Sequence, residues 1–391
     1  MSDQTVLTEP GCASAPNVHD QSLAHGRIGR LLFDIERARR GQGDRRHVRA
    51  ALADCLRQPL LAHETAALYL GAPAVAFAIN AAADAGGFTR ALTTLDTRIA
   101  RLTRRRIGIA EQRIHRRERP LTGEFDLFYG LTGLGAYWLR RAPRSAVFRD
   151  VLTYLVRLIE PLPGDDGRLP GWWTDRDPSG RRSAAFPGGH GNLGMAHGIG
   201  GPLALLSLAT RAAVVVPGQL EAIARICEWL DGVRDDSGAG PRWPYWVTRA
   251  CNKPGGAGPQ GPRRPSWCYG TPGLARAQQL AGIALGDHSR QHLAERALLT
   301  CLSDTRQLGQ IREAGLCHGA AGVLHTTART AADAEPGMFR KHLNELRERV
   351  TAMPAEGHGD LLNGTPGREL ALLTADTNTT ASGWDTCLLT G

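Results

Sequence analysis

A short glycine pattern recurs along this chain of 391 residues. In each copy, two glycines are separated by two residues and followed by a run rich in alanine and leucine. Complete copies begin at Gly130, Gly198, Gly270, Gly319 and Gly364, and a weaker copy at Gly71 has Ala74 in place of the second glycine. The intervals leave room for two helices each, which is typical of a chain of helical repeats. No copy contains a convincing strand pattern, so the chain is predicted to be all-α.

The segments of the repeat alternate in polarity. Each glycine pair begins an apolar stretch without a charged face, which predicts a helix buried on most sides. The intervening stretches, such as residues 146–160 and 291–304, have helical periodicity and one polar face. This alternation predicts an α/α toroid, a double ring whose inner helices follow the glycines. An open α-solenoid is the alternative; glycine at every inner-helix start favours closure, because helices converging on an axis need small residues where they crowd.

The residues beside the glycine pairs carry reactive groups. A closed ring would bring the starts of its inner helices, with their free N–H groups, to one common cavity. The residues before the first glycines are Tyr129, His197, Tyr269, His318 and Asn363, and Asp126, Cys268 and Cys317 lie next to them. Alone, a cysteine is usually core filler. Together, Cys268, Cys317 and His318 make a ligand set that suits Zn²⁺ and leaves its fourth position open, as in catalytic sites.

Three motifs in this frame resemble those of the lanthionine synthetase C family, the zinc-dependent cyclases of lanthipeptide biosynthesis. They are HGIGG from His197, WCYGTPG from Trp267 and LCHGAAG from Leu316, and the resemblance extends from about Ala67 to residues 383–389. It implies an α/α toroid whose Zn²⁺ is held by Cys268, Cys317 and His318. It also implies site roles for Asp126, His197, Arg264, Trp267 and Tyr269.

The resemblance implies a reaction that these residues suit. Members of the family add a cysteine thiol of a precursor peptide to dehydroalanine or dehydrobutyrine, which forms a thioether ring. Zinc would deprotonate the thiol, whose ordinary pKa is about 8.5. His197 is the expected proton donor to the resulting enolate, with Asp126 and Arg264 as orienting groups; which of His197 and Asp126 is acid and which is base stays open. The expected partners are a dehydrated precursor, with leader and core, and a separate dehydratase.

Two other functions remain alternatives. Protein prenyltransferase β subunits are also α/α toroids that use zinc to alkylate a thiol, but their ligand set includes an aspartate. The second alternative is a related zinc protein that binds glutathione or a partner protein as a scaffold, without cyclase activity. The complete set of Asp126, His197 and Arg264 favours the cyclase.

Charge and composition bound the remaining expectations. The formal net charge is +9, almost all from arginine. Arginines cluster in residues 101–119, which predicts a solvated helix face, with a patch for an acidic peptide as the alternative. The absence of interleaved aromatic residues argues against nucleic-acid binding. The proline- and glycine-rich stretch 232–266 is a candidate wall of a peptide groove.

The chain is expected to form one domain over residues 21–391. Residues 1–20 lack the basic start and apolar core of a signal peptide and are predicted to be disordered. No stretch reaches the roughly 18 apolar residues of a membrane span. A soluble cytoplasmic enzyme is therefore expected.

Overall fold

The structure, a computed structural model, describes residues 18–83, 87–162, 169–236, 238, 240–249, 264–354 and 359–391. These residues are predominantly helical, as predicted. Most of the N-terminal segment that is predicted to be disordered lies outside them, and its residues 18–20 belong to a 3₁₀ helix, η1, at Val18–Gln21.

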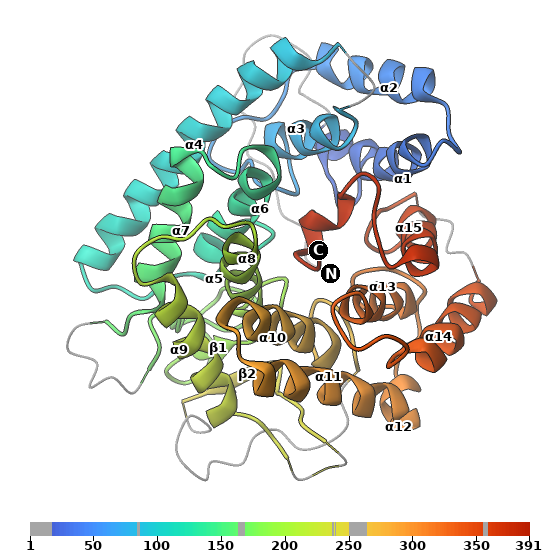
Figure 1. Ribbon diagram of the computed structural model, residues 1–391. Coiled ribbons are helices and arrows are strands. Elements are labelled where there is room, and N and C mark those ends of the chain that lie inside the picture. Colours follow the sequence, from blue (N-terminus) through green and yellow to red (C-terminus); the bar gives the residue numbers. More distant parts are fainter. Residues whose placement is uncertain are drawn as a thin grey trace.

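Seven helices form a closed inner ring (Figure 1). They are α1 (Arg27–Arg39), α3 (Ala72–Ala81), α6 (Leu131–Arg141), α8 (Gly200–Arg211), α10 (Thr271–Leu285), α13 (Ala320–Ala331) and α15 (Thr365–Thr377). Each packs against the next in this order, and α15 packs against α1. The contact between α15 and α1 makes the fold an α/α toroid and excludes the open solenoid.

A second layer of helices surrounds the ring. It consists of α2 (Arg45–Arg57), α4 (Thr89–His115), α7 (Ala146–Ile159), α9 (Gln219–Gly232), α11 (His288–Ser303) and α14 (Arg340–Ala352), with short helices α5 (Thr122–Phe125) and α12 (Thr305–Leu308). These outer helices are amphipathic. In α7, Phe148, Leu152 and Leu155 are buried, whereas Arg149 and Arg157 bind polar partners at the surface. Burying each large apolar side chain contributes about 1.5–3 kcal/mol, which holds the outer layer on the inner ring.

In the loops that have a second glycine, this residue permits a close approach of two backbone segments. A Cβ atom on Gly273 would lie 2.0 Å from the carbonyl oxygen of Trp267, and one on Gly322 would lie 1.9 Å from that of Leu316. Contacts this short do not occur between a real Cβ and a backbone oxygen, so alanine cannot replace these glycines without a shift of the backbone. The glycine pattern thus reflects how tightly each loop folds over the start of its inner helix.

The glycine loop before α1 was not predicted from the sequence. Helix α1 follows Gly26 and Gly29, which have the same spacing as the other pairs, and a Cβ on Gly29 would lie 2.0 Å from the carbonyl oxygen of Leu23. The signal was present in the sequence HGRIG. The arginines and acidic residues of α1 are typical of an outer helix, so the sequence gives conflicting signals at this position.

The C-terminal segment fills the middle of the ring (Figure 1). Its 3₁₀ helix η3 (Trp384–Leu388) is largely buried and contacts α6. The carbonyl of Cys387 accepts a hydrogen bond from the hydroxyl of Tyr69 at 2.7 Å, and that of Leu388 accepts one from Nε1 of Trp267 at 3.0 Å. The inner helices are therefore packed around a peptide segment.

Two elements depart from a purely helical chain. Strands β1 (His190–Asn192) and β2 (Trp246–Thr248) form a short antiparallel pair in which His190 lies opposite Thr248. The sequence analysis did not expect them, because three-residue strands are too short to show alternation. Strand β2 lies within the predicted groove wall, of which residues 237, 239 and 250–263 are outside the described residues.

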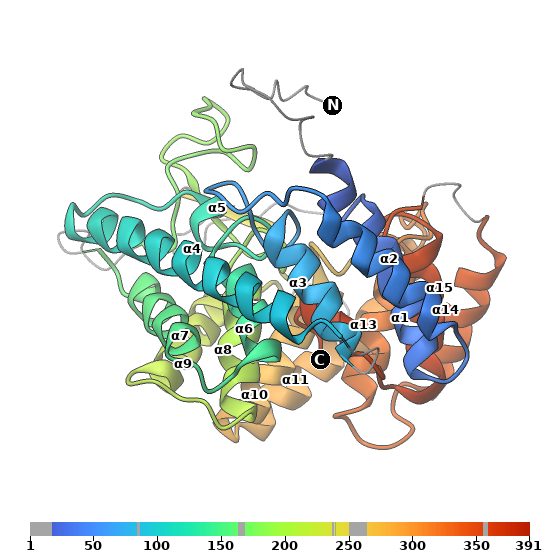
Figure 2. The same ribbon diagram turned by 90° about the horizontal axis from the view of Figure 1, so that it is seen from above.

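The arginine cluster is largely engaged in contacts within the protein. It begins on α4, the longest helix of the described residues, seen along one side of the molecule in Figure 2. Arg113 forms a buried ion pair with Glu124 at 2.8 Å, and Arg106 donates to the carbonyls of Glu64 and Tyr129. The predicted solvated face holds for only part of the cluster: Arg104 and Arg105 are exposed, whereas Arg113 is buried. None of the described helices is long and apolar enough to cross a membrane.

Candidate active site

Hydrogen bonds between neighbouring loops align the starts of the inner helices. The backbone N–H of Cys317 donates to the carbonyl oxygen of Leu362 at 2.9 Å. The N–H of Cys268 donates to the carbonyl oxygen of Cys317 at 3.2 Å, and the N–H of Met195 donates to the carbonyl oxygen of Cys268 at 3.0 Å. The loops before α8, α10, α13 and α15 are thereby linked in ring order. This linkage brings Cys268 and Cys317 together although they lie far apart in the sequence.

Cys268, Cys317 and His318 lie together in a cluster that could hold a metal ion. One ligand atom from each residue lies within 4.8 Å of the others. Cys268 is buried, and Cys317 and His318 are partly accessible. Two sulfur atoms and one imidazole nitrogen at this separation suit tetrahedral Zn²⁺, and three protein ligands leave one position for a substrate. The donor set therefore fits zinc.

The two thiols of the cluster share a hydrogen bond. A hydrogen bond from Cys317 is the main cause that lowers the pKa of Cys268 below its ordinary value, against the opposing effect of burial. The same bond and burial raise the pKa of Cys317 well above its ordinary value. A hydrogen bond to Cys268 also raises the pKa of His318. Even without a metal, the site therefore stabilises one thiolate, which is the form that binds zinc.

Asp126 and His197 form a hydrogen-bonded pair across two adjacent loops. Nδ1 of His197 is 2.7 Å from Oδ2 of Asp126, while Oδ1 accepts the backbone N–H groups of Tyr129 and Gly130 at 2.6 and 2.8 Å. The Asp126 side chain is 1% exposed and that of His197 is 33% exposed. Asp126 is thus fixed within the loop, and it orients an imidazole whose Nε2 is left for other partners.

Aromatic rings surround this histidine. The ring centroid of Phe128 lies 4.9 Å from that of His197, and Tyr129 stacks on His197 with centroids 5.8 Å apart. Phe128 also stacks on Tyr69 at 4.1 Å. Tyr129 is 60% exposed, so one side of the histidine is bordered by an accessible apolar surface.

The other predicted site residues lie at or behind the cluster. Arg264 is near enough for its charge to favour the thiolate of Cys317, although the hydrogen bond to Cys268 and burial dominate that pKa. The hydroxyl of Tyr269 accepts a hydrogen bond from Asn192 at 2.9 Å, and burial raises its pKa to about 12. Trp267 is buried and donates to the central C-terminal segment. The indole of Trp267 therefore ties the loop before α10 to the C-terminal segment.

Two further polar pairs at this rim were missed by the sequence analysis. Nε2 of His318 is 2.7 Å from Oε2 of Glu313, and Nδ1 of His25 is 3.2 Å from Oδ2 of Asp360. Each of these histidines precedes the first glycine of its loop, as His197 does. Asp360 lies four residues before its loop glycine, as Asp126 does, and this shared spacing is a sequence signal that would have pointed to the pair.

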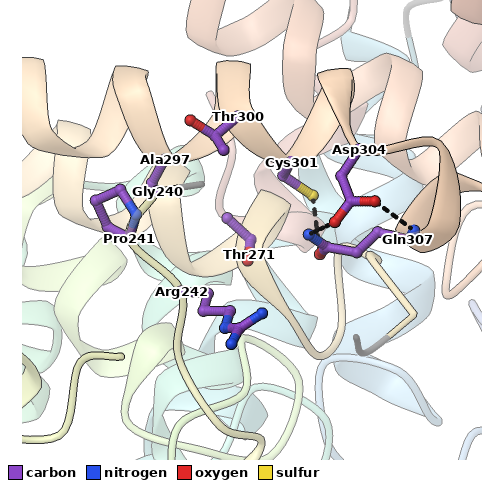
Figure 3. A pocket seen from close by; sticks show the side chains of 9 residues that line it. All are labelled: Gly240, Pro241, Arg242, Thr271, Ala297, Thr300, Cys301, Asp304 and Gln307. Atoms are coloured by element: carbon purple, nitrogen blue, oxygen red, sulfur yellow. Dashed lines mark hydrogen bonds between the residues drawn. The ribbon is translucent and has the colours of Figure 1, made fainter. Parts of the chain in front are cut away.

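Two cavities in the described part of the chain lie away from the candidate site. One, of about 20 Å³, is lined by Gly240, Pro241, Arg242, Thr271, Ala297, Thr300, Cys301, Asp304 and Gln307 (Figure 3). This volume holds about one water molecule. Burial raises the pKa of Cys301 to about 12, so its thiol is protonated and unreactive.

Comparison with known proteins gives a family match and matches to solved structures. The family profile described as "Lanthionine synthetase C-like protein" matches residues 17–356. A solved structure titled "Nisin cyclase" has a TM-score of 0.78 and 20% sequence identity, and the match covers 96% of this chain and 93% of that chain. No curated protein matches this sequence. At this identity the structural likeness establishes the α/α toroid fold.

Proposed function

Because this chain belongs to the lanthionine synthetase C-like family, we propose that it is a zinc-dependent lanthipeptide cyclase. In the proposed reaction, a cysteine thiol of a dehydrated precursor peptide adds to the β-carbon of dehydroalanine or dehydrobutyrine. The products are lanthionine and methyllanthionine thioether rings. The observation that carries the proposal is the meeting of Cys268, Cys317 and His318 on the rim that also bears the His197–Asp126 pair.

Zinc held by Cys268, Cys317 and His318 would bind the substrate thiol and keep it as a thiolate at neutral pH. The ligands themselves contribute negative charge from two sulfur atoms. With zinc bound, this charge would favour an electron-rich, nucleophilic sulfur at the open position. Arg264, whose charge acts on the Cys317 thiol, offers a positive charge for orienting a carbonyl of the peptide.

The proton that completes the addition is assigned to His197. Addition of sulfur forms a C–S bond and an enolate, and protonation at the α-carbon of the enolate completes the ring. With Nδ1 bound to Asp126, the imidazole presents Nε2 as its proton-transfer atom, and Asp126 stabilises the imidazolium before transfer. Tyr269, whose pKa is raised to about 12, retains its proton at neutral pH and serves as a hydrogen-bonding group.

The proposal extends to partners and location. The dehydrated residues must be made before this step, which assigns their formation to a separate dehydratase. A cytoplasmic location suits free thiols: the described cysteines at positions 55, 227, 268, 301, 317 and 387 are all unpaired.

The test combines zinc analysis with mass spectrometry. The purified protein is incubated with a dehydrated Ser/Thr/Cys-derived precursor, and unreacted thiols are then alkylated. Ring formation leaves the precursor mass unchanged and removes its alkylatable thiols. The expected result is stoichiometric zinc and progressive loss of alkylation, both abolished in Cys317→Ala. A fully active, metal-free Cys317→Ala variant would refute the mechanism.

Parallel incubations separate the alternatives. Alkylation of a peptide thiol by a prenyl diphosphate would assign the protein to prenyl transfer. Zinc and glutathione binding with no loss of precursor thiols, across several dehydrated precursors, would favour the scaffold.

A further inference from the structure

His318 has a carboxylate partner that the ligand set does not include. Oε2 of Glu313 lies 2.7 Å from Nε2 of His318, a distance typical of a charge-assisted hydrogen bond. The two side chains are partly accessible, at 43% for Glu313 and 28% for His318. Because Nε2 is bound to Glu313, Nδ1 is the ring nitrogen left for a metal.

The position of Glu313 is set by the start of α13. Its carbonyl accepts the backbone N–H of Ala320 at 2.9 Å, and the next two carbonyls, of Ala314 and Gly315, accept from Ala321 and Gly322 at 3.1 and 3.2 Å. Three successive hydrogen bonds hold residues 313–315 against the helix. The carboxylate is therefore attached to a fixed backbone, although its side chain reaches solvent.

Glu313 is not itself a member of the ligand set. Among the described residues, the group whose ligand atoms all lie within 4.8 Å of one another contains Cys268, Cys317 and His318. Glu313 contacts the cluster through Nε2 of His318. This is the arrangement in which a carboxylate orients a metal-binding histidine and strengthens its donor nitrogen.

The comparison with His197 shows why the contact matters. Both histidines stand immediately before the first glycine of a loop, and both bind one carboxylate. Asp126 binds Nδ1 of His197, whereas Glu313 binds Nε2 of His318. The carboxylate partner thus determines which nitrogen each equivalent histidine presents.

We infer that Glu313 is a positioning residue for the metal ligand His318: it fixes the tautomer and ring orientation in which Nδ1 binds the metal. The inference rests on the proposed function only in taking Zn²⁺ as the metal. It makes no assumption about the peptide substrate.

The test measures zinc affinity by competition with a chromogenic chelator at fixed pH. Glu313→Ala is expected to raise the Kd for Zn²⁺ by about 10- to 100-fold, the usual effect of losing such a partner. Glu313→Gln keeps an acceptor oxygen without the charge and should fall between Glu313→Ala and the wild type. Glu348→Ala, which removes an exposed carboxylate on α14, is the matched control and should leave the Kd unchanged.

The thermal midpoint of the metal-free protein separates positioning from a general structural role. It should be the same in Glu313→Ala, Glu313→Gln and the wild type. Wild-type zinc affinity in Glu313→Ala would overturn the inference, as would a loss of affinity that matches a loss of metal-free stability. A wild type that binds zinc but forms no rings would refute the cyclase proposal and leave the role of Glu313 intact.

Discussion

Individual side chains at the rim acquire their chemistry from their partners. Asp126 is nearly inaccessible, and it binds two backbone N–H groups as well as His197. A carboxylate held in this way costs little reorganisation when the imidazole changes its charge. His197 is more exposed and borders the aromatic surface of Tyr129, which fits its proposed role as the proton donor.

Replacement of the histidine should therefore separate catalysis from metal binding. His197→Ala is expected to lower the rate of ring formation by about 10²- to 10⁴-fold, the usual contribution of a general acid, while zinc content stays at the wild-type level. The measurements are metal analysis and the time course of thiol loss in the precursor. Loss of zinc in this variant would show that His197 belongs to the metal site.

Asp126→Asn tests the orienting contact separately. The amide oxygen can still accept the N–H groups of Tyr129 and Gly130, but the charge that stabilises the imidazolium is lost. The maximum rate of ring formation should fall, while the KM for precursor and the thermal midpoint change little. An unchanged rate would remove Asp126 from the mechanism.

At the scale of elements, the glycine loops determine how closely the inner helices pack on the loops before them. Gly322 lies where a Cβ would be 1.9 Å from a backbone carbonyl, whereas Gly108, in the middle of α4, has no atom within 4 Å of a Cβ at its position. The same substitution should therefore have opposite effects at the two sites.

Gly322→Ala is expected to lower the free energy of unfolding by about 3 kcal/mol, because the neighbouring backbone has to move. Gly108→Ala should raise it by about 0.5–1 kcal/mol, because alanine reduces the entropy lost on folding and favours the helix. Thermal midpoints of the two variants, measured side by side, check this. Equal shifts would contradict the assigned role of the second glycine.

At the scale of the whole molecule, buried charges join different repeats. Arg276 of α10 is 1% exposed and lies 2.8 Å from Oδ2 of Asp333, and Arg211, the last residue of α8, binds the same carboxylate at 2.7 Å. Asp333 follows the end of α13. Arg276 also donates to the carbonyl of Thr390 in the central segment. This network connects three inner helices with the segment that fills the ring.

The network makes stability depend on pH. Burial would raise the pKa of Asp333, but hydrogen bonds and charge from Arg211 and Arg276 outweigh it and lower the pKa to about 2. The pKa of an aspartate in the unfolded chain is 3.8. The stabilisation that the ionised Asp333 side chain gives is therefore complete above about pH 4 and is lost as the pH falls toward 2. A shift of this size corresponds to about 2 kcal/mol.

Asp333→Asn should therefore destabilise the protein at pH 7 by about 3 kcal/mol, because a buried guanidinium loses its ionised partner. The difference from wild type should shrink between pH 4 and pH 2, as measured by denaturant unfolding. Asp150→Asn, at an exposed ion pair with Arg104, is the control and should change stability by less than about 1 kcal/mol. A pH-independent difference would contradict the role of the ionised carboxylate.

Much of the architecture followed from the repeated pattern, because the reasons for it are local. All six glycine loops identified in the sequence precede inner helices, and Cys268, Cys317 and His318 converge as predicted. The two short strands and the loop at Gly26 were missed. The strands depend on pairing between distant segments, and the polar residues of α1 concealed its inner position.

The sequence by itself determined the repeat, the α/α class and the side chains capable of binding zinc. These depend on glycine spacing, helical periodicity and residue type, all of which act over a few residues. The tertiary structure decided that α15 packs against α1 and that the C-terminal segment fills the centre. It also decided which nitrogen of His197 and of His318 is bound to a carboxylate. Those outcomes depend on contacts and distances that arise only when the chain closes on itself.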